Sequence, residues 1–214
     1  MSVRNLTRKF LPALSKLSAE NKLFINAMPE MRLAQMLRNG DKNIVQVGMN
    51  QCKAARILPG KIHTIYTDGL AGCNSVGVVA KGLDGNPVAI LSHYTPLQTS
   101  RQLQMSVIDK QLQTYDYYLD KTFSPKIFYN IPGYPDEKQV LQPCVNPLVE
   151  SIKSVFNKWF KSGYDEHIAL YQCRNRPAFF SSANIFQFDP KNVNNLKITT
   201  VGEKEHFINL AKNV

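Results

Sequence analysis

Two apolar segments, residues 75–81 and 87–94, flank the sequence Asp84-Gly85-Asn86, and this pair constrains the fold more than any other feature. Asp-Gly favours a tight turn because glycine accepts the positive φ that such turns require. Both segments are rich in β-branched and small apolar residues and have the length of an ordinary strand. We therefore predict an antiparallel hairpin here.

Further strand-length apolar segments lie on both sides of the hairpin, mixed with helical patterns. The predicted strands are 44–49, 61–67, 126–131, 167–173, 184–188 and 196–201. The predicted helices are 100–120, 146–161 and a short terminal segment, 203–211. Strands mixed with a few helices, without strict strand–helix–strand alternation, indicate an α+β fold.

The clearest helix signal begins at Asn146, a capping residue, with Pro147 in the first turn and Gly163 just beyond the end. Apolar residues recur along it at helical spacing, and Trp159 belongs to this stripe. We therefore expect Trp159 to lie in the core rather than in a ligand platform.

The N-terminal residues 1–40 have a different character. Apolar residues recur among basic ones from Leu6 onwards, which indicates a packed helix, and a second helix is predicted from Pro29 to Gly40. Residues 1–40 are therefore expected to be a helical region packed on an α+β catalytic domain, 41–214. No compact apolar core followed by a small-residue cleavage site occurs, so we do not expect a general secretory signal.

The chain has 214 residues, 26 of them Lys or Arg and 16 Asp or Glu, for a formal net charge of +10. A 43% hydrophobic content indicates a globular rather than a disordered chain. No apolar run approaches the roughly 18 residues that cross a bilayer, so we expect a soluble protein without a membrane span. Residues 1–61 contain 11 basic and 3 acidic side chains, whereas residues 62–120 contain 3 and 5. The basic excess is thus remote from the centre of the chain, and no nucleic-acid-binding motif accompanies it.

The four cysteines, Cys52, Cys73, Cys144 and Cys173, form no CxxC pair. Their spacing predicts neither a zinc site nor a disulfide scaffold, and it is typical of reduced thiols. Cofactors are not expected. Asp165, Glu166 and His167 are adjacent in a predicted strand and therefore alternate between its faces, which disfavours a metal site.

The most unusual local sequence runs from Thr67 to Ser75 and includes Gly69, Gly72 and Cys73. The glycines leave backbone amides uncovered by side chains, and amides beside a thiol are what an oxyanion hole requires. In the predicted hairpin, the start of the first strand lies beside the end of the second, so Cys73 and His93 should meet across neighbouring strands. A thiol and an imidazole so placed form a nucleophile–base pair, in which His93 lowers the pKa of Cys73.

Three features together resemble a known family: Thr67 six positions before Cys73, the tetrapeptide Leu70-Ala71-Gly72-Cys73, and a histidine at the end of the next strand. The family comprises the glutamine deamidases of the chemoreceptor-deamidase, cytotoxic-necrotizing-factor and Burkholderia-lethal-factor class. The resemblance implies Cys73 as nucleophile, His93 as base and Thr67 as the residue that orients His93, with Leu70, Ala71 and Gly72 forming the loop and oxyanion site. It also implies a mixed β-sandwich flanked by helices.

The implied reaction is hydrolysis of a glutamine side chain on a target protein through a thioester on Cys73. The resemblance further implies a bacterial toxin or effector, located in the cytoplasm of the producer or secreted into a host cell. Two other hypotheses remain. A cysteine protease or transglutaminase would use the same thiol and imidazole, whereas a basic module that binds nucleic acid or protein would use its cysteines structurally.

Two further histidines and one further cysteine are weaker candidates. His63 shares a predicted strand with Thr67 and is expected to be a partly exposed strand residue. His206 is expected on the solvated face of the terminal helix. Cys52 has no histidine neighbour in the sequence, but the adjacent Lys53 could lower the pKa of its thiol.

Overall fold

The computed structural model describes residues 39–70, 72–135, 141–143, 146–172, 182–200 and 206–210. The predicted N-terminal helices lie outside these residues, apart from a turn at Asn39 and Gly40. All the statements below concern the described residues.

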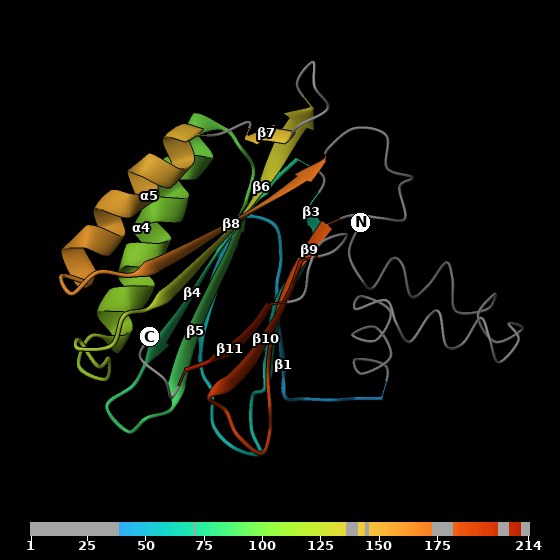
Figure 1. Ribbon diagram of the computed structural model, residues 1–214. Coiled ribbons are helices and arrows are strands. Elements are labelled where there is room, and N and C mark those ends of the chain that lie inside the picture. Colours follow the sequence, from blue (N-terminus) through green and yellow to red (C-terminus); the bar gives the residue numbers. More distant parts are fainter. Residues whose placement is uncertain are drawn as a thin grey trace, which may run out of the picture.

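Two β-sheets and two helices form three layers (Figure 1). The five-stranded sheet has the order β1-β3-β9-β10-β11, with β1 and β3 parallel and the other neighbours antiparallel. Its strands are β1 (Ile44–Val47), β3 (Thr64–Leu70), β9 (Ser182–Phe188), β10 (Asn195–Thr200) and β11 (His206–Asn209).

The six-stranded sheet has the order β2-β5-β4-β6-β7, and β8 pairs in parallel with β6. Its strands are β2 (Gln51–Arg56), β4 (Asn74–Lys81), β5 (Pro87–Tyr94), β6 (Lys126–Pro135), β7 (Leu141–Pro143) and β8 (Asp165–Gln172). Both sheets therefore mix parallel and antiparallel pairs. The predicted α+β fold, with two mixed sheets and flanking helices, is confirmed.

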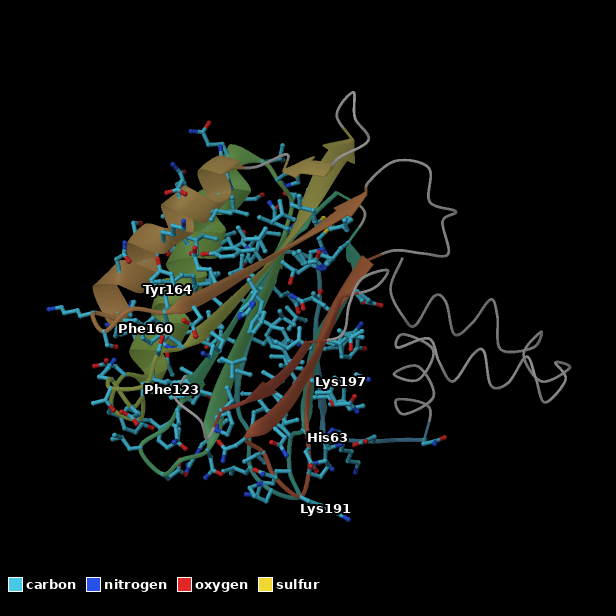
Figure 2. All side chains as sticks on the ribbon, viewed as in Figure 1. His63, Phe123, Phe160, Tyr164, Lys191 and Lys197 are labelled. Atoms are coloured by element: carbon cyan, nitrogen blue, oxygen red, sulfur yellow. The ribbon has the colours of Figure 1, made fainter. Side chains whose placement is uncertain are left out.

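Helices α4 (Gln98–Tyr115) and α5 (Asn146–Trp159) lie side by side over one face of the six-stranded sheet (Figure 1). Alternate residues of β4 and β5 face these helices and pack with the apolar stripe of α5, which includes Ile152 and Phe156. Figure 2 shows Phe160 and Tyr164 where the chain leaves α5. Trp159 is only partly buried against this core, and its indole nitrogen donates to Asp109 of α4. The indole thus holds the two helices together.

The other face of the six-stranded sheet packs on the five-stranded sheet, and Gly77 of β4 shows how closely. A Cβ atom at Gly77 would lie 2.1 Å from Cζ of Phe186 on β9, far inside van der Waals contact. Around this contact lies a second core that includes Leu91, Phe128 and Phe188. Residues of β4 and β5 therefore alternate between a helix-facing core and an inter-sheet core.

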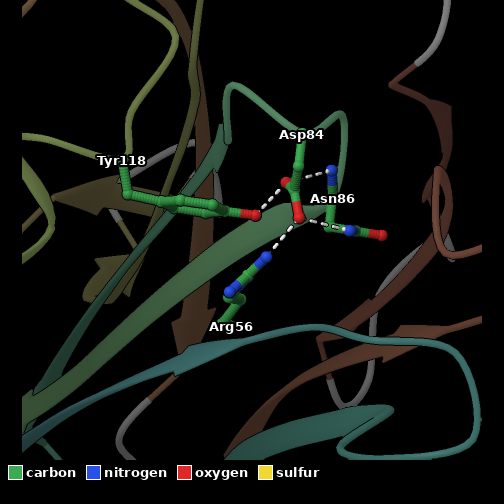
Figure 3. A network of polar contacts seen from close by, with 4 residues as sticks. All are labelled: Arg56, Asp84, Asn86 and Tyr118. Carbon is green, nitrogen blue, oxygen red and sulfur yellow. Dashed lines mark hydrogen bonds and ion pairs between the residues drawn. The ribbon is translucent and has the colours of Figure 1, made fainter.

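The predicted hairpin is confirmed. Strands β4 and β5 are antiparallel with Lys81 opposite Pro87, and Gly85 in the turn has a φ of 81°. The Asp84 carboxylate accepts hydrogen bonds from Asn86, Arg56 and Tyr118, which join the turn to β2 and to the end of α4 (Figure 3).

Some predicted elements differ from the structure. The terminal helix predicted over 203–211 is wrong, because His206–Asn209 forms β11 and pairs with β10. Strands β2 and β7 were not predicted, and α4 ends at Tyr115 rather than at residue 120. Short segments carry too few residues for their periodicity to separate helix from strand, so pairing with a neighbouring strand decides.

Candidate active site

A hydrogen bond between the two sheets joins Thr67 of β3 to His93 of β5. Thr67 Oγ1 lies 2.7 Å from His93 Nδ1, and the same oxygen donates its hydrogen to the backbone oxygen of Val47 at 2.8 Å. Neither side chain is more than 2% exposed. The sequence pattern placed both residues in the candidate site, and the structure brings them into direct contact.

This pair of hydrogen bonds determines the tautomer of His93. A hydroxyl group has one hydrogen, and a carbonyl oxygen can only accept. Thr67 therefore gives its hydrogen to Val47 and accepts a hydrogen from His93 Nδ1. In the neutral ring the other nitrogen, Nε2, then carries a lone pair. Nε2 is buried and has no hydrogen-bond partner among the described residues.

Burial lowers the pKa of His93 from its ordinary value of 6.5 to about 4. The physical cause is the loss of water around the charged ring, which disfavours the imidazolium form. At neutral pH the ring is therefore neutral, with its base nitrogen unprotonated. A lone pair held in this state has the form that a general base needs.

Cys73 directly precedes β4, which begins at Asn74. Ser75 is directly opposite His93 in the β4–β5 register, and extending the strand alternation by one residue would put Cys73 on the face of Ser75. Diagonal neighbours of this kind have Cα atoms about 7–8 Å apart. Cys73 is partly exposed, and no hydrogen bond connects its sulfur to Nε2 of His93.

The electrostatic state of Cys73 differs from the expectation. Burial raises the pKa of the Cys73 thiol above its ordinary value of 9.0, whereas the sequence predicted a lowered pKa. A neutral imidazole supplies no positive charge to stabilise a thiolate, and partial burial removes the water that would. At neutral pH both Cys73 and His93 are therefore uncharged.

Tyr171 of β8 fixes the loop before Cys73. Its hydroxyl accepts a hydrogen bond from the Gly72 amide at 2.9 Å and donates one to the Cys73 carbonyl at 2.6 Å. Gly72 has a φ of 113°, a conformation that glycine adopts without strain. The Gly72 amide was expected to donate to the oxyanion, but in the structure it donates to Tyr171. Leu70 is buried at the end of β3, and Ala71 lies outside the described residues.

A second polar pair between the sheets escaped the sequence analysis. Asn184 of β9 donates from Nδ2 to Ser75 Oγ at 3.1 Å, and both side chains are fully buried. Asn184 Oδ1 has no partner among the described residues. The signal for this pair was weak: an asparagine at the start of a mostly apolar predicted strand, where packing between sheets does not require a polar side chain.

The remaining histidines and Cys52 lie outside the Thr67–His93 pair. His63 lies just before β3 and is 3.2 Å from Asp41, and His167 stacks on Phe128 with ring centroids 4.9 Å apart. His206 belongs to a strand, so its prediction on a helix face is wrong. Burial raises the pKa of Cys52 to about 12, opposite to the effect expected from Lys53. None of these residues joins the Thr67–His93 pair.

Within the described ranges, no group of three or more His, Cys, Asp or Glu side chains could hold a metal ion. No helix there is long and apolar enough to cross a membrane. Comparison with known proteins identifies no family: no family model matches the chain, and no curated protein matches it significantly. The chemistry must therefore be argued from the site itself.

Proposed function

We propose that this protein hydrolyses the side-chain amide of a glutamine on a target protein, with Cys73 as nucleophile and His93 as general base. The observation that carries the proposal is the fixed tautomer of His93. Its Nδ1 hydrogen is held by Thr67, which leaves Nε2 with a lone pair, and His93 lies opposite Ser75, two residues along the chain from Cys73. An imidazole oriented by a third group, next to a thiol, is the arrangement of nucleophilic acyl transfer.

The reaction would start from the uncharged pair. As the substrate binds, the Cys73 proton moves to His93 Nε2, the sulfur attacks the amide carbon, and a C–S bond forms. The Nε2 proton then passes to the leaving nitrogen, the C–N bond breaks, and ammonia departs. Water, activated by Nε2, hydrolyses the thioester to glutamate and returns the proton to sulfur.

Thr67 would contribute most while His93 carries the proton. A hydrogen bond from a charged ring is shorter and roughly twice as strong as one from a neutral ring. Thr67 can accept this stronger hydrogen bond from Nδ1 without moving, because its own hydrogen is already donated to the Val47 backbone oxygen. The bond would thus offset part of the cost of charging a buried imidazole.

Mass spectrometry tests the proposal directly. The purified chain is incubated with proteins of a cell lysate, and we expect glutamines that gain about 1 Da, the signature of hydrolysis to glutamate. Cys73→Ala should abolish the gain. Cys52→Ala is the matched control, because Cys52 is the other described free cysteine and belongs to β2, outside the site.

Each other outcome has a distinct consequence. Cleaved peptide bonds would assign the thiol to a protease, and glutamine–lysine cross-links would assign it to a transglutaminase. Deamidation that persists in Cys73→Ala, or is lost equally in Cys52→Ala, would contradict the role of Cys73. His93→Asn should be as inactive as Cys73→Ala, because it retains a donor toward Thr67 but lacks the base nitrogen.

A further inference from the structure

Four buried side chains form a closed ring between the sheets, which we call the polar ring: Thr67, Ser75, His93 and Asn184. Thr67 and Asn184 are opposite each other in β3 and β9, and Ser75 and His93 are opposite each other in β4 and β5. Two hydrogen bonds between the sheets, Thr67–His93 and Asn184–Ser75, close the ring. None of the four is more than 2% exposed.

The polar ring contains two acceptors that no described residue satisfies. Asn184 donates from Nδ2 to Ser75, and its Oδ1 has no partner among the described residues. His93 directs Nδ1 to Thr67, and its Nε2 lone pair is likewise unpartnered. A buried acceptor without a donor is costly, so such a group in a native fold calls for an explanation.

The chemistry of these acceptors limits what they bind. A carbonyl oxygen and an imidazole lone pair both require a hydrogen donor. One small group that satisfies both must present two hydrogens, as water and a primary carboxamide do. A carboxylate presents none, and its charge would meet two lone pairs. The pair of acceptors therefore fits such a donor only while His93 is neutral, as it is when water attacks the thioester.

Resting on the proposed function, we propose that Asn184 Oδ1 and His93 Nε2 together bind the water that hydrolyses the thioester on Cys73. Once ammonia has left with the proton, His93 is neutral, and its Nε2 accepts one hydrogen of the water while Asn184 Oδ1 accepts the other. Asn184 is thereby a binding residue that positions the water for attack.

The hydrolytic step balances with these residues. One hydrogen of the water is bound by Asn184 Oδ1 and stays on oxygen, while His93 Nε2 removes the other. The oxygen attacks the thioester carbon, a C–O bond forms and the C–S bond breaks. The proton on Nε2 then passes to the Cys73 sulfur, which restores the starting pair.

Methanol distinguishes this role from a structural one, because its single hydroxyl hydrogen can serve His93 but leaves Asn184 unsatisfied. The enzyme acts on lysate proteins in buffer that contains methanol. A glutamine hydrolysed by water gains about 1 Da, whereas its methyl ester gains about 15 Da. Wild type should strongly prefer water. Asn184→Leu should lower the water-to-methanol product ratio about tenfold.

One further variant serves as a control. Gln104→Leu removes another buried amide, which belongs to α4 and donates to Ser92 Oγ at 2.9 Å on the helix-facing side of the sheet, and it should leave the ratio unchanged. Each ratio compares two products of the same sample. Partial unfolding therefore lowers the yield of both products without altering their ratio. Asn184→Ala replaces Asn184→Leu if the latter does not fold.

The outcomes separate the two proposals. A wild type that leaves every glutamine unchanged overturns the proposed function and this inference with it. A wild type that deamidates, with an Asn184→Leu ratio within twofold of its own, overturns the inference alone. The same holds if Gln104→Leu shifts the ratio as much as Asn184→Leu.

Discussion

Acidification should destabilise this fold through His93, and the structure gives both the sign and the size of the effect. In the folded protein burial holds the pKa of His93 at about 4, against an ordinary value of 6.5. The unfolded chain therefore takes up a proton near pH 6.5 that the folded chain refuses until about pH 4. Stability is complete above pH 6.5 and is lost as the pH falls through this window.

The magnitude follows from the difference in pKa. Each unit corresponds to about 1.4 kcal/mol, so the full loss below pH 4 is about 3 kcal/mol. Between pH 7 and pH 5, a range that leaves most carboxylates charged, the expected loss from His93 is about 2 kcal/mol. That is a large part of the free energy of unfolding of a typical domain.

Urea unfolding at the two pH values measures this loss, with fluorescence of the single tryptophan, Trp159, as the signal. His93→Asn is the comparison, because an asparagine amide can still donate to Thr67 but does not titrate. Wild type should lose about 2 kcal/mol more than His93→Asn between pH 7 and pH 5. All other side chains are common to the two proteins, so their contributions to the difference cancel.

Equal losses in the two proteins would refute the reasoning, because they would mean that folded His93 accepts a proton as readily as the unfolded chain. A second measurement addresses the tautomer. Nitrogen NMR of the folded protein at pH 7 should show His93 Nδ1 protonated and Nε2 unprotonated. The reverse assignment would contradict the bond from Nδ1 to Thr67 and remove the basis for Nε2 as the base.

Three further perturbations test the packing and the loop. Gly77→Ala should destabilise the protein by about 1–3 kcal/mol in urea unfolding, because its Cβ overlaps Phe186; an unchanged stability would contradict the close packing of the sheets. Tyr171→Phe removes the hydroxyl that bridges two backbone groups beside Cys73, so we expect a loss of about 1–3 kcal/mol and faster alkylation of that thiol. In wild type, the alkylation rate of Cys73 should be low at pH 7 and should still rise above pH 9, whereas Cys52 should react more slowly at every pH. An alkylation rate of Cys73 that levels off below pH 8 would show that its pKa is lowered.

Local chemistry made the β4–β5 hairpin predictable. An Asp-Gly turn between two apolar segments defines the pairing, and the pairing puts Ser75, two residues after Cys73, opposite His93. The polar contacts across the sheets were not predictable in the same way. Asn184 and Ser75 are 109 residues apart in the chain, and Tyr171 is 99 residues from Gly72. No periodicity links residues so distant, so only the packed sheets reveal their contact.

Charge states also depended on the tertiary structure. The sequence placed a thiol and an imidazole near each other, from which a thiolate was expected. In the fold, partial burial raises the pKa of Cys73 and burial lowers that of His93, so both are neutral. Solvent exposure is a property of the assembled layers, and a sequence indicates it only through the average behaviour of each residue type.

The sequence by itself determined the turns, the long helices, most strands and the α+β class, because these follow from the conformational preferences and apolar spacing of residues close together in the chain. The tertiary structure decided that His206 belongs to a strand, that Thr67 holds His93 by its Nδ1 hydrogen, and that Asn184 completes the polar ring. These features arise where strands from different sheets meet. There, burial removes water, so a polar group that lacks its hydrogen bond lowers the stability of the fold.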